Sequence, residues 1–260
     1  MESANIVGYQ NKDLNRNANS FVVQTFLPCG VTKENVTLGT FKPKDGVDGW
    51  DYYTDYLATL KPNGNLDKKY GYVSPYWAKQ YWNEEDAGWY DFAVLAEDPE
   101  TIEADKADST LIPFGTGFLV YTSKANGTMT FSGEVLEGDI ALPLSRNANT
   151  FVGNVTPQTI QLNKLLATSG GDGWDYYTDY LATLKTNGNL LHKYGYLSPY
   201  WAKQYWNEED AGWYDFAVLA EDPETIEADK VADDVVFNPG EGFLIYTSKA
   251  NVELLVPGAL

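Results

Sequence analysis

One long segment occurs twice in this chain, and this repeat limits the architectures that the chain can adopt. Residues Gly49–Lys106 return at Gly173–Lys230, and only four of the 58 paired positions differ. A repeat of this length indicates a structural unit that is present twice. With 260 residues, the chain is long enough for two units of about 130 residues, each with its own core.

The repeated unit extends beyond this block. The segment LNRNANSFV at Leu14–Val22 is matched by LSRNANTFV at Leu144–Val152. This flank is offset by 130 positions and the block by 124, so an insertion lies between them, where loops tolerate it. Both flanks contain the tetrapeptide RNAN, which predicts a turn because asparagine tolerates the left-handed backbone region. We therefore predict two homologous domains, at residues 1–138 and 139–260.

Several short segments have the composition of strands or helices. Gly117–Thr122 and Thr128–Val135 are rich in β-branched and aromatic residues, and the Asn-Gly pair between them favours a hairpin. Trp50–Leu57 alternates between two sets of side chains, which is typical of a strand with two different faces. Two short helices are expected in each block, after Ser74-Pro75 and after Asp98-Pro99 in the first copy, because serine or aspartate caps a helix that begins with proline.

These patterns predict a mostly β fold made of two homologous tandem units. Each unit is expected to be a β-sandwich or a partly open β-barrel with short inserted helical turns. A doubly wound α/β fold is disfavoured, because the sequence has neither alternating long helices nor a glycine-rich phosphate-binding loop. The segments Ile6–Tyr9 and Val252–Val256 are expected to be edge strands, which pair readily with another chain.

Charge and composition exclude several classes of function. The chain has 18 lysine and arginine residues against 37 aspartate and glutamate residues, so its formal charge is −19. Such a chain repels phosphate groups, and we expect neither a nucleic-acid partner nor an anionic lipid partner. No apolar run approaches the roughly 20 residues of a membrane span. Cys29 is the single cysteine and His192 the single histidine, which excludes an internal disulfide, a cysteine cluster and a multi-histidine metal site.

Tryptophan, tyrosine and acidic residues are concentrated in the two blocks. All eight tryptophans and 16 of the 19 tyrosines lie there, and the blocks together carry −14 of the net charge. Residues of this kind can stack on sugar rings, form a protein interface, or pair with one another inside a core. The composition leaves these three uses open.

The helix expected after Ser74-Pro75 would place Trp77 and Tyr81 on one face, because residues spaced i and i+4 are neighbours on a helix. Such a face can pack on a sheet, and part of it can still reach solvent. The candidate binding residues are Tyr76, Trp77, Tyr81, Trp82 and Trp89, together with their copies Tyr200, Trp201, Tyr205, Trp206 and Trp213.

An acidic loop at the start of each block resembles a calcium-binding loop. Hard cations bind several carboxylates on a backbone that is bent at glycine. The spacing is not that of an EF-hand, and an Asp/Gly turn explains the same residues. Calcium is thus the single cofactor that the sequence suggests. The candidate ligands are Asp45, Asp48 and Asp51 in the first copy, and Asp172 and Asp175 in the second.

A catalytic function is not expected. His192 is replaced by Lys68 in the other copy and Cys29 has no counterpart, so the two copies share no nucleophile–histidine site. Paired carboxylates can hydrolyse a glycosidic bond, which makes a glycoside hydrolase the enzyme class closest to this sequence. Acidic residues this abundant also form pairs by chance. The available carboxylates are Glu84, Glu85, Asp86 and Asp91.

Each unit ends in the same strand motif. The second unit reads GEGFLIY at Gly240–Tyr246 and the first reads GTGFLVY at Gly115–Tyr121, in each case after a Trp/Tyr-rich middle. This GxGFxxY pattern resembles uncharacterised tandem β-rich modules of bacterial secreted and cell-surface proteins. The resemblance covers both repeats, and it implies an extracellular, non-catalytic setting without indicating a ligand.

The sequence therefore predicts a non-catalytic extracellular or cell-surface protein with a structural or assembly role. Its aromatic blocks would contact a second copy of the chain or another surface protein. The alternative is a bivalent carbohydrate-binding protein, in which two near-identical blocks raise the avidity for a polysaccharide. The first residues lack the features of a signal peptide, so the chain is expected either as the mature form of a secreted or surface protein of a bacterium, or in the cytoplasm.

Overall fold

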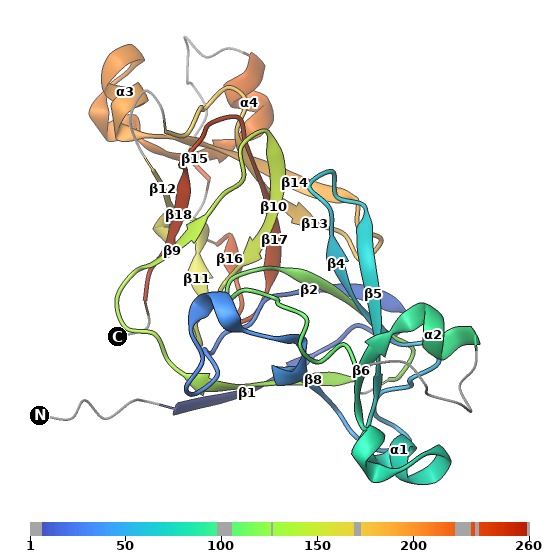
Figure 1. Ribbon diagram of the computed structural model, residues 1–260. Coiled ribbons are helices and arrows are strands. Elements are labelled where there is room, and N and C mark those ends of the chain that lie inside the picture. Colours follow the sequence, from blue (N-terminus) through green and yellow to red (C-terminus); the bar gives the residue numbers. More distant parts are fainter. Residues whose placement is uncertain are drawn as a thin grey trace, which may run out of the picture. The chain divides into compact units, whose positions relative to one another are not determined.

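The structure is a computed structural model that describes residues 7–97, 106–125, 127–168, 173–221, 230–231 and 234–258. The chain divides into two compact units, Met1–Val135 and Leu136–Leu260, whose elements are labelled in Figure 1. Strand residues outnumber helical residues, and the named strands of the described ranges pair only in antiparallel fashion. The predicted mostly β class is confirmed.

Unit 1 contains a five-stranded and a three-stranded sheet. The larger sheet has the order β2 (Ala18–Val22), β7 (Phe118–Thr122), β4 (Tyr56–Leu60), β5 (Leu66–Val73) and β6 (Gly88–Asp91). The smaller sheet has the order β1 (Val7–Asp13), β8 (Thr128–Glu134) and β3 (Lys42–Pro43). In the larger sheet β7 lies between β2 and β4, so the strand that carries the GxGFxxY motif holds the opening and middle segments of the unit together.

Unit 2 has sheets of the same topology. Its larger sheet has the order β10 (Ala148–Gly153), β17 (Gly242–Thr247), β13 (Tyr180–Leu184), β14 (Leu190–Leu197) and β15 (Gly212–Asp215). Its smaller sheet has the order β9 (Ile140–Pro143), β18 (Glu253–Val256) and β12 (Leu166–Ala167). A two-stranded sheet of β11 (Ile160–Gln161) and β16 (Val236–Phe237) corresponds to a single bridge, Thr37 to Leu111, in unit 1.

The helices are short. The α-helices are α1 (Pro75–Tyr81), α2 (Phe92–Glu97), α3 (Pro199–Tyr205) and α4 (Phe216–Glu221), and the 3₁₀ turns are η1 (Lys33–Asn35), η2 (Leu38–Thr40), η3 (Glu84–Asp86), η4 (Leu162–Lys164) and η5 (Glu208–Asp210). The predicted start of α1 at Pro75 is confirmed: Ser74 has extended backbone angles and proline occupies the first helical position. The helix expected after Asp98-Pro99 lies outside the described residues. Within the described ranges, no helix combines the length and the apolar character that crossing a membrane requires.

An aromatic core joins the two sheets of unit 1. Phe41 directly precedes β3, and its ring centroid lies 4.9 Å from that of Phe118 in β7 and 6.0 Å from that of Phe131 in β8. The ring centroids of Trp89 in β6 and Trp50 lie 5.6 Å apart. Full burial of an aromatic side chain stabilises a fold by roughly 2–3 kcal/mol, so these buried rings contribute to holding the two sheets together.

The strand predicted over Trp50–Leu57 is wrong for most of its length. The segment before Tyr56 is a turn, and β4 begins only at Tyr56. The side chain of Asp51 accepts a hydrogen bond from the backbone N–H of Tyr53 at 3.0 Å, and the backbone N–H of Asp55 donates to the carbonyl of Asp51 at 2.9 Å. These local bonds stabilise a turn in spite of the alternating pattern.

The predicted hairpin between Gly117–Thr122 and Thr128–Val135 is also wrong. Both strands form, as β7 and β8, but they belong to different sheets. The residue that follows β7, Ser123, donates its backbone N–H to the carboxylate of Asp55 at 2.7 Å, so the chain is held beside β4 and not folded back on β7.

Of the two segments predicted to be edge strands, only the N-terminal one is an edge strand. The strand β1, which includes the described part of Ile6–Tyr9, pairs on one side with β8 and is an edge strand of its sheet. Val252–Val256 corresponds to β18, which is the central strand between β9 and β12. Its backbone hydrogen-bonding groups are therefore engaged on both sides, and that segment cannot pair edge to edge with another chain.

Gly133 in β8 tests how closely this strand approaches the backbone at Leu27. Its φ is +152°, and a Cβ atom at this position would lie 2.1 Å from the carbonyl oxygen of Leu27. Gly133→Ala is expected to lower the free energy of unfolding by roughly 2–4 kcal/mol, because both backbone strain and a clash arise. Gly30→Ala is the control: its φ is +74° with open space around the added Cβ, so about 1 kcal/mol is expected. Equal losses in denaturant unfolding would contradict the close approach.

Candidate functional site

Six aromatic side chains gather where α1 meets the turn that precedes β4. The turn contributes two tyrosines, and α1 with the residue that follows it contributes two tyrosines and two tryptophans. We call this set the aromatic patch of unit 1, and it consists of Tyr52, Tyr53, Tyr76, Trp77, Tyr81 and Trp82.

Tyr52 lies at the centre of the patch. Its ring centroid is 5.5 Å from that of Trp77, 5.1 Å from that of Trp82 and 6.3 Å from that of Tyr81. The contacts with both tryptophans are edge-to-face, which is the favourable geometry for aromatic rings. A turn residue thus fixes the positions of side chains that α1 contributes.

A hydrogen bond and a buried hydrophobic cluster hold the side chains of α1 in place. Trp77 donates its indole N–H to the carbonyl of Trp50 at 2.8 Å. Ala78 is fully buried in a cluster with Val73 and Leu95, and the ring of Trp77 packs against this cluster. Trp77 and Tyr81 stack with an interplanar angle of 19°, which confirms that they share one face of the helix.

Three tyrosines of the patch face solvent. Tyr53 is 47% exposed, Tyr76 is 37% exposed and Tyr81 is 54% exposed. Trp77 and Trp82 are only partly exposed. The patch therefore presents tyrosine rings above a half-buried base of tryptophan, which is apolar on one side and polar at the hydroxyl groups.

Unit 2 contains the same arrangement. Its central residue is Tyr176, whose ring centroid lies 5.7 Å from that of Trp201 and 5.3 Å from that of Trp206. The residues that correspond to the exposed tyrosines of unit 1 are also exposed. The aromatic patch of unit 2 consists of Tyr176, Tyr177, Tyr200, Trp201, Tyr205 and Trp206.

Two of the predicted binding residues belong to the core and not to the patches. Trp89 is 0% exposed and Trp213 is 3% exposed. Their indole N–H groups donate to backbone carbonyls, that of Phe41 at 3.2 Å and that of Leu165 at 2.8 Å. Side chains that are sealed from solvent and hydrogen-bonded inside a unit are structural residues, so we remove both from the candidate surface.

A buried carboxylate that the sequence analysis did not identify holds each patch in place. Asp55 is fully buried and accepts five hydrogen bonds of 2.7–3.0 Å. The donors are the backbone N–H of Asp51, the hydroxyl of Thr54, the hydroxyl of Thr122, and both the N–H and the hydroxyl of Ser123. The carboxylate thus ties the patch-bearing turn to the end of β7.

The same bonds recur at Asp179 in unit 2, where the partners at the end of β17 are Thr247 and Ser248. An ion pair supports each turn: Lys124 Nζ lies 3.3 Å from an Asp51 carboxylate oxygen, and Lys249 Nζ lies 3.4 Å from an oxygen of Asp175. The repeated tetrapeptide YTSK, which begins at the end of each closing strand, was the available sequence signal for this network.

The structure places the candidate calcium ligands in other roles where it describes them. Asp51 and Asp175 are engaged by lysine, as given above, and Asp48 is exposed. Asp172 lies outside the described residues. Among the described residues, no group of three or more acidic, histidine or cysteine side chains is arranged to hold a metal ion. Calcium binding stays a prediction.

Asp45 caps the start of α1. Its carboxylate accepts hydrogen bonds from the backbone N–H of Tyr76 at 3.0 Å and of Gly46 at 2.8 Å. Partial burial of the carboxyl opposes ionisation, but the nearby Ser74 hydroxyl and the hydrogen bonds from the backbone N–H groups of Tyr76 and Gly46 outweigh burial and hold the pKa of Asp45 below its ordinary value. A carboxylate is therefore fixed beside the patch at neutral pH.

Two of the carboxylates considered for hydrolysis serve local structure. Asp86 accepts a hydrogen bond from the backbone N–H of Asn83 at 2.9 Å, and Asp91 accepts one from the N–H of Ala93 at 2.9 Å. Glu84 and Glu85 are exposed. Three of these residues belong to η3 and Asp91 ends β6, and we assign none of the four a chemical step.

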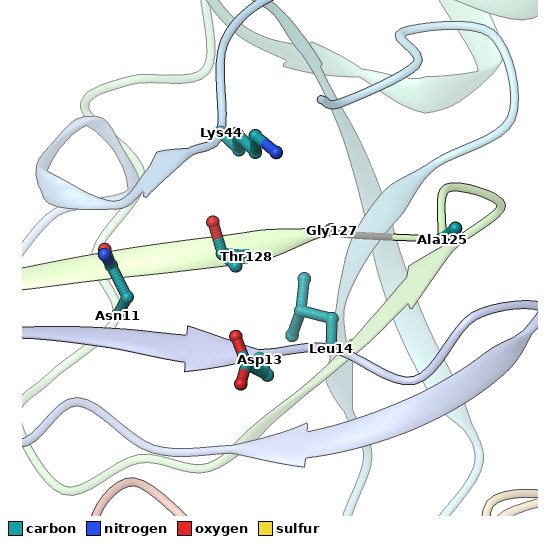
Figure 2. A pocket seen from close by; sticks show the side chains of 7 residues that line it. All are labelled: Asn11, Asp13, Leu14, Lys44, Ala125, Gly127 and Thr128. Atoms are coloured by element: carbon teal, nitrogen blue, oxygen red, sulfur yellow. The ribbon is translucent and has the colours of Figure 1, made fainter. Parts of the chain in front are cut away.

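A pocket of about 500 Å³ lies in unit 1, and Figure 2 labels the residues that line it. The side chains of Asp13 and Lys44 lie on either side of Thr128 in this view (Figure 2). The corresponding positions of unit 2 hold Pro143 and Thr168, so the charged residues are not duplicated. We therefore do not place the shared site here. The lining residues are Asn11, Asp13, Leu14, Lys44, Ala125, Gly127 and Thr128.

No protein family model, no curated protein and no solved structure matches this chain. The assignment of the two patches as the candidate site therefore rests on their geometry and on their duplication.

Asp55→Ala is expected to lower the free energy of unfolding by roughly 3–5 kcal/mol, because buried N–H and hydroxyl donors lose their acceptor. Asp51→Asn is the control, since it removes only a partly exposed ion pair and should cost less than about 1 kcal/mol. Denaturant unfolding measures both values. A loss in Asp55→Ala no greater than that in the control would show that the network does not hold the turn.

Alkaline pH provides a second test of the core beneath the patches. Burial, with a smaller effect from nearby aspartates, raises the pKa of Tyr72, Tyr90 and Tyr214 to about 12. These tyrosines ionise near pH 10 in the unfolded chain but stay neutral in the folded chain up to about pH 12. Their contribution to stability is therefore constant below pH 10 and falls between pH 10 and 12, by roughly 1–3 kcal/mol per tyrosine. The double variant Tyr90→Phe, Tyr214→Phe should lose less over this range; equal pH-dependent losses would contradict the assignment.

Proposed function

We propose that this chain is a non-catalytic structural or assembly protein of the secreted or cell-surface class, and that it contacts another protein through its two aromatic patches. The observation that supports this most strongly is the duplication of an exposed tyrosine cluster on a preorganised base. Both patches have the same residues and the same ring contacts, although their frames have diverged.

The composition of the patches favours a protein interface. Tyrosine and tryptophan dominate the residues that contribute most to binding energy, because they bury a large area and keep a polar group at their tip. Contacts with Tyr52 and Trp77 restrain the other rings of the patch before any partner arrives. Less side-chain entropy is then lost on binding.

The two patches also provide bivalency. A partner with repeated epitopes, such as a fibre or a surface layer, can engage both patches of one chain, and the second contact then forms at a high effective concentration. Individually modest contacts would suffice for stable attachment.

A polysaccharide is the second candidate. The specific observation in its favour is the stacked pair of Trp77 and Tyr81 in unit 1, with the equivalent pair in unit 2, because exposed aromatic rings can stack on the faces of sugar rings. The negative charge of the chain would not repel a neutral sugar.

The finer description of each unit as a β-sandwich or partly open β-barrel belongs to this proposal. It is supported in unit 1 by Phe41, which contacts an aromatic residue of each sheet. The bacterial surface setting is supported by the closing-strand motif, which coincides with β7 and β17. We propose no catalytic residue.

The test is a variant in which the exposed tyrosines of both patches are replaced by serine. Binding to peptide arrays and glycan arrays and self-association in sedimentation velocity would be measured for this variant and for the unsubstituted chain. Tyr9→Ser, at an exposed tyrosine outside the patches, is the matched control. The patch variant is Tyr53→Ser, Tyr76→Ser and Tyr81→Ser with Tyr177→Ser, Tyr200→Ser and Tyr205→Ser.

We expect at least a tenfold weaker peptide or self-association signal in the patch variant, because each interface tyrosine contributes about 1–2 kcal/mol, and an unchanged signal in the control. Loss confined to glycans would identify the second candidate instead. Binding that survives the substitutions, or no binding and no self-association by the unsubstituted chain, would refute the proposal.

A further inference from the structure

The acidic charge of this chain is largely unneutralised. Against a formal charge of −19, the described residues contain only two ion pairs, Lys124 with Asp51 and Lys249 with Asp175. Exposed carboxylates outside these pairs, among them those of Glu84 and Glu85, can therefore attract an external cation. Their position relative to the aromatic patches decides whether they contribute to the same surface.

Carboxylates lie at both ends of α1. At its start, Asp45 accepts a hydrogen bond from the backbone N–H of Tyr76. After its end, η3 packs against the helix and carries Glu84 and Glu85, both exposed. In unit 2, η5 carries Glu208 and Glu209 in the same place after α3.

Local cations offset only part of this charge. Lys106 Nζ donates to the backbone carbonyls of Glu85 and Ala87, not to a carboxylate. Lys79 on α1 is exposed, and Lys124 is engaged by Asp51 in an ion pair. The carboxylates of Glu84 and Glu85 make no ion pair with any described residue.

Two lysines of this chain already make cation–π contacts with tyrosine rings. Lys69 Nζ lies 4.2 Å from the ring centroid of Tyr56, and Lys193 Nζ lies 4.1 Å from that of Tyr180. An ammonium group over a tyrosine face gains roughly 0.5–1 kcal/mol at an exposed site. The exposed tyrosines of α1 and the exposed carboxylates of η3, which packs against this helix, thus offer ring faces and ion-pair partners to the cations of one segment.

We propose that the partner of the aromatic patches is a protein segment rich in lysine and arginine. This inference rests on the proposed function and specifies its partner. A second copy of the chain is disfavoured as the patch partner, because it would bring the same negative charge to the contact. A neutral polysaccharide would leave the carboxylates without a role.

Octalysine, with an uncharged Gly-Ser octapeptide as reference, is the probe. The glutamine variant, with substitutions in η3 and η5, is Glu84→Gln, Glu85→Gln, Glu208→Gln and Glu209→Gln. Its matched control removes four exposed carboxylates on other elements and so changes the net charge equally. The control variant is Glu34→Gln, Glu137→Gln, Asp139→Asn and Glu253→Gln.

We expect octalysine, but not the Gly-Ser peptide, to bind in titration calorimetry at low salt, and the affinity to fall as salt is added. The glutamine variant should bind at least about fivefold more weakly and the control less than twofold more weakly. The serine variant of the patch tyrosines, which keeps the full charge, should also lose at least about fivefold.

Equal losses in the two charge variants, or no binding of octalysine, would overturn the inference. If binding to neutral peptides still depends on the patch tyrosines, the proposed function stands and only the basic partner is wrong. If no binding depends on these tyrosines, both proposals fail. Self-association through the patches that strengthens with salt would identify a second copy as the partner and would also overturn the inference.

Discussion

A buried carboxylate determines how each unit presents its surface. Asp55 in unit 1 and Asp179 in unit 2 each accept five hydrogen bonds, and the donors come from segments almost 70 residues apart in the chain. A buried charge is stable only when it is fully hydrogen-bonded, so the turn cannot move independently of the strand that ends beside it. Because that turn carries Tyr52, the carboxylate also fixes the base of the aromatic patch.

Features that depend on neighbouring residues were predictable from the sequence. The start of α1 follows from Ser74-Pro75, because a cap and a fixed φ act within one helical turn. The RNAN turns were predicted likewise, and Asn17 and Asn147 adopt the left-handed conformation with φ of 51° and 52°. The mostly β class followed from the strand composition, and the aromatic patches were partly identified from the i, i+4 spacing on α1.

Features that depend on distant residues were not predictable. No local pattern indicates that Asp55 bonds to Ser123, so the separation of β7 from β8 could not be foreseen. The burial of Trp89 depends on its contacts with Phe41 and Trp50, which come from another part of the unit. Tryptophans with the same local composition thus differ in exposure because tertiary packing decides which of them is covered.

The two units keep the same aromatic patches although the segments that flank the repeated blocks differ. For this reason we propose the exposed tyrosines as the binding surface. Hydroxyl-radical footprinting of the full chain, alone and with bound octalysine, tests this most directly. We expect protection at Tyr53, Tyr81, Tyr177 and Tyr205, and unchanged oxidation at Tyr9, which is exposed outside the patches. Protection at Tyr9 with no change at the four patch tyrosines would contradict the account.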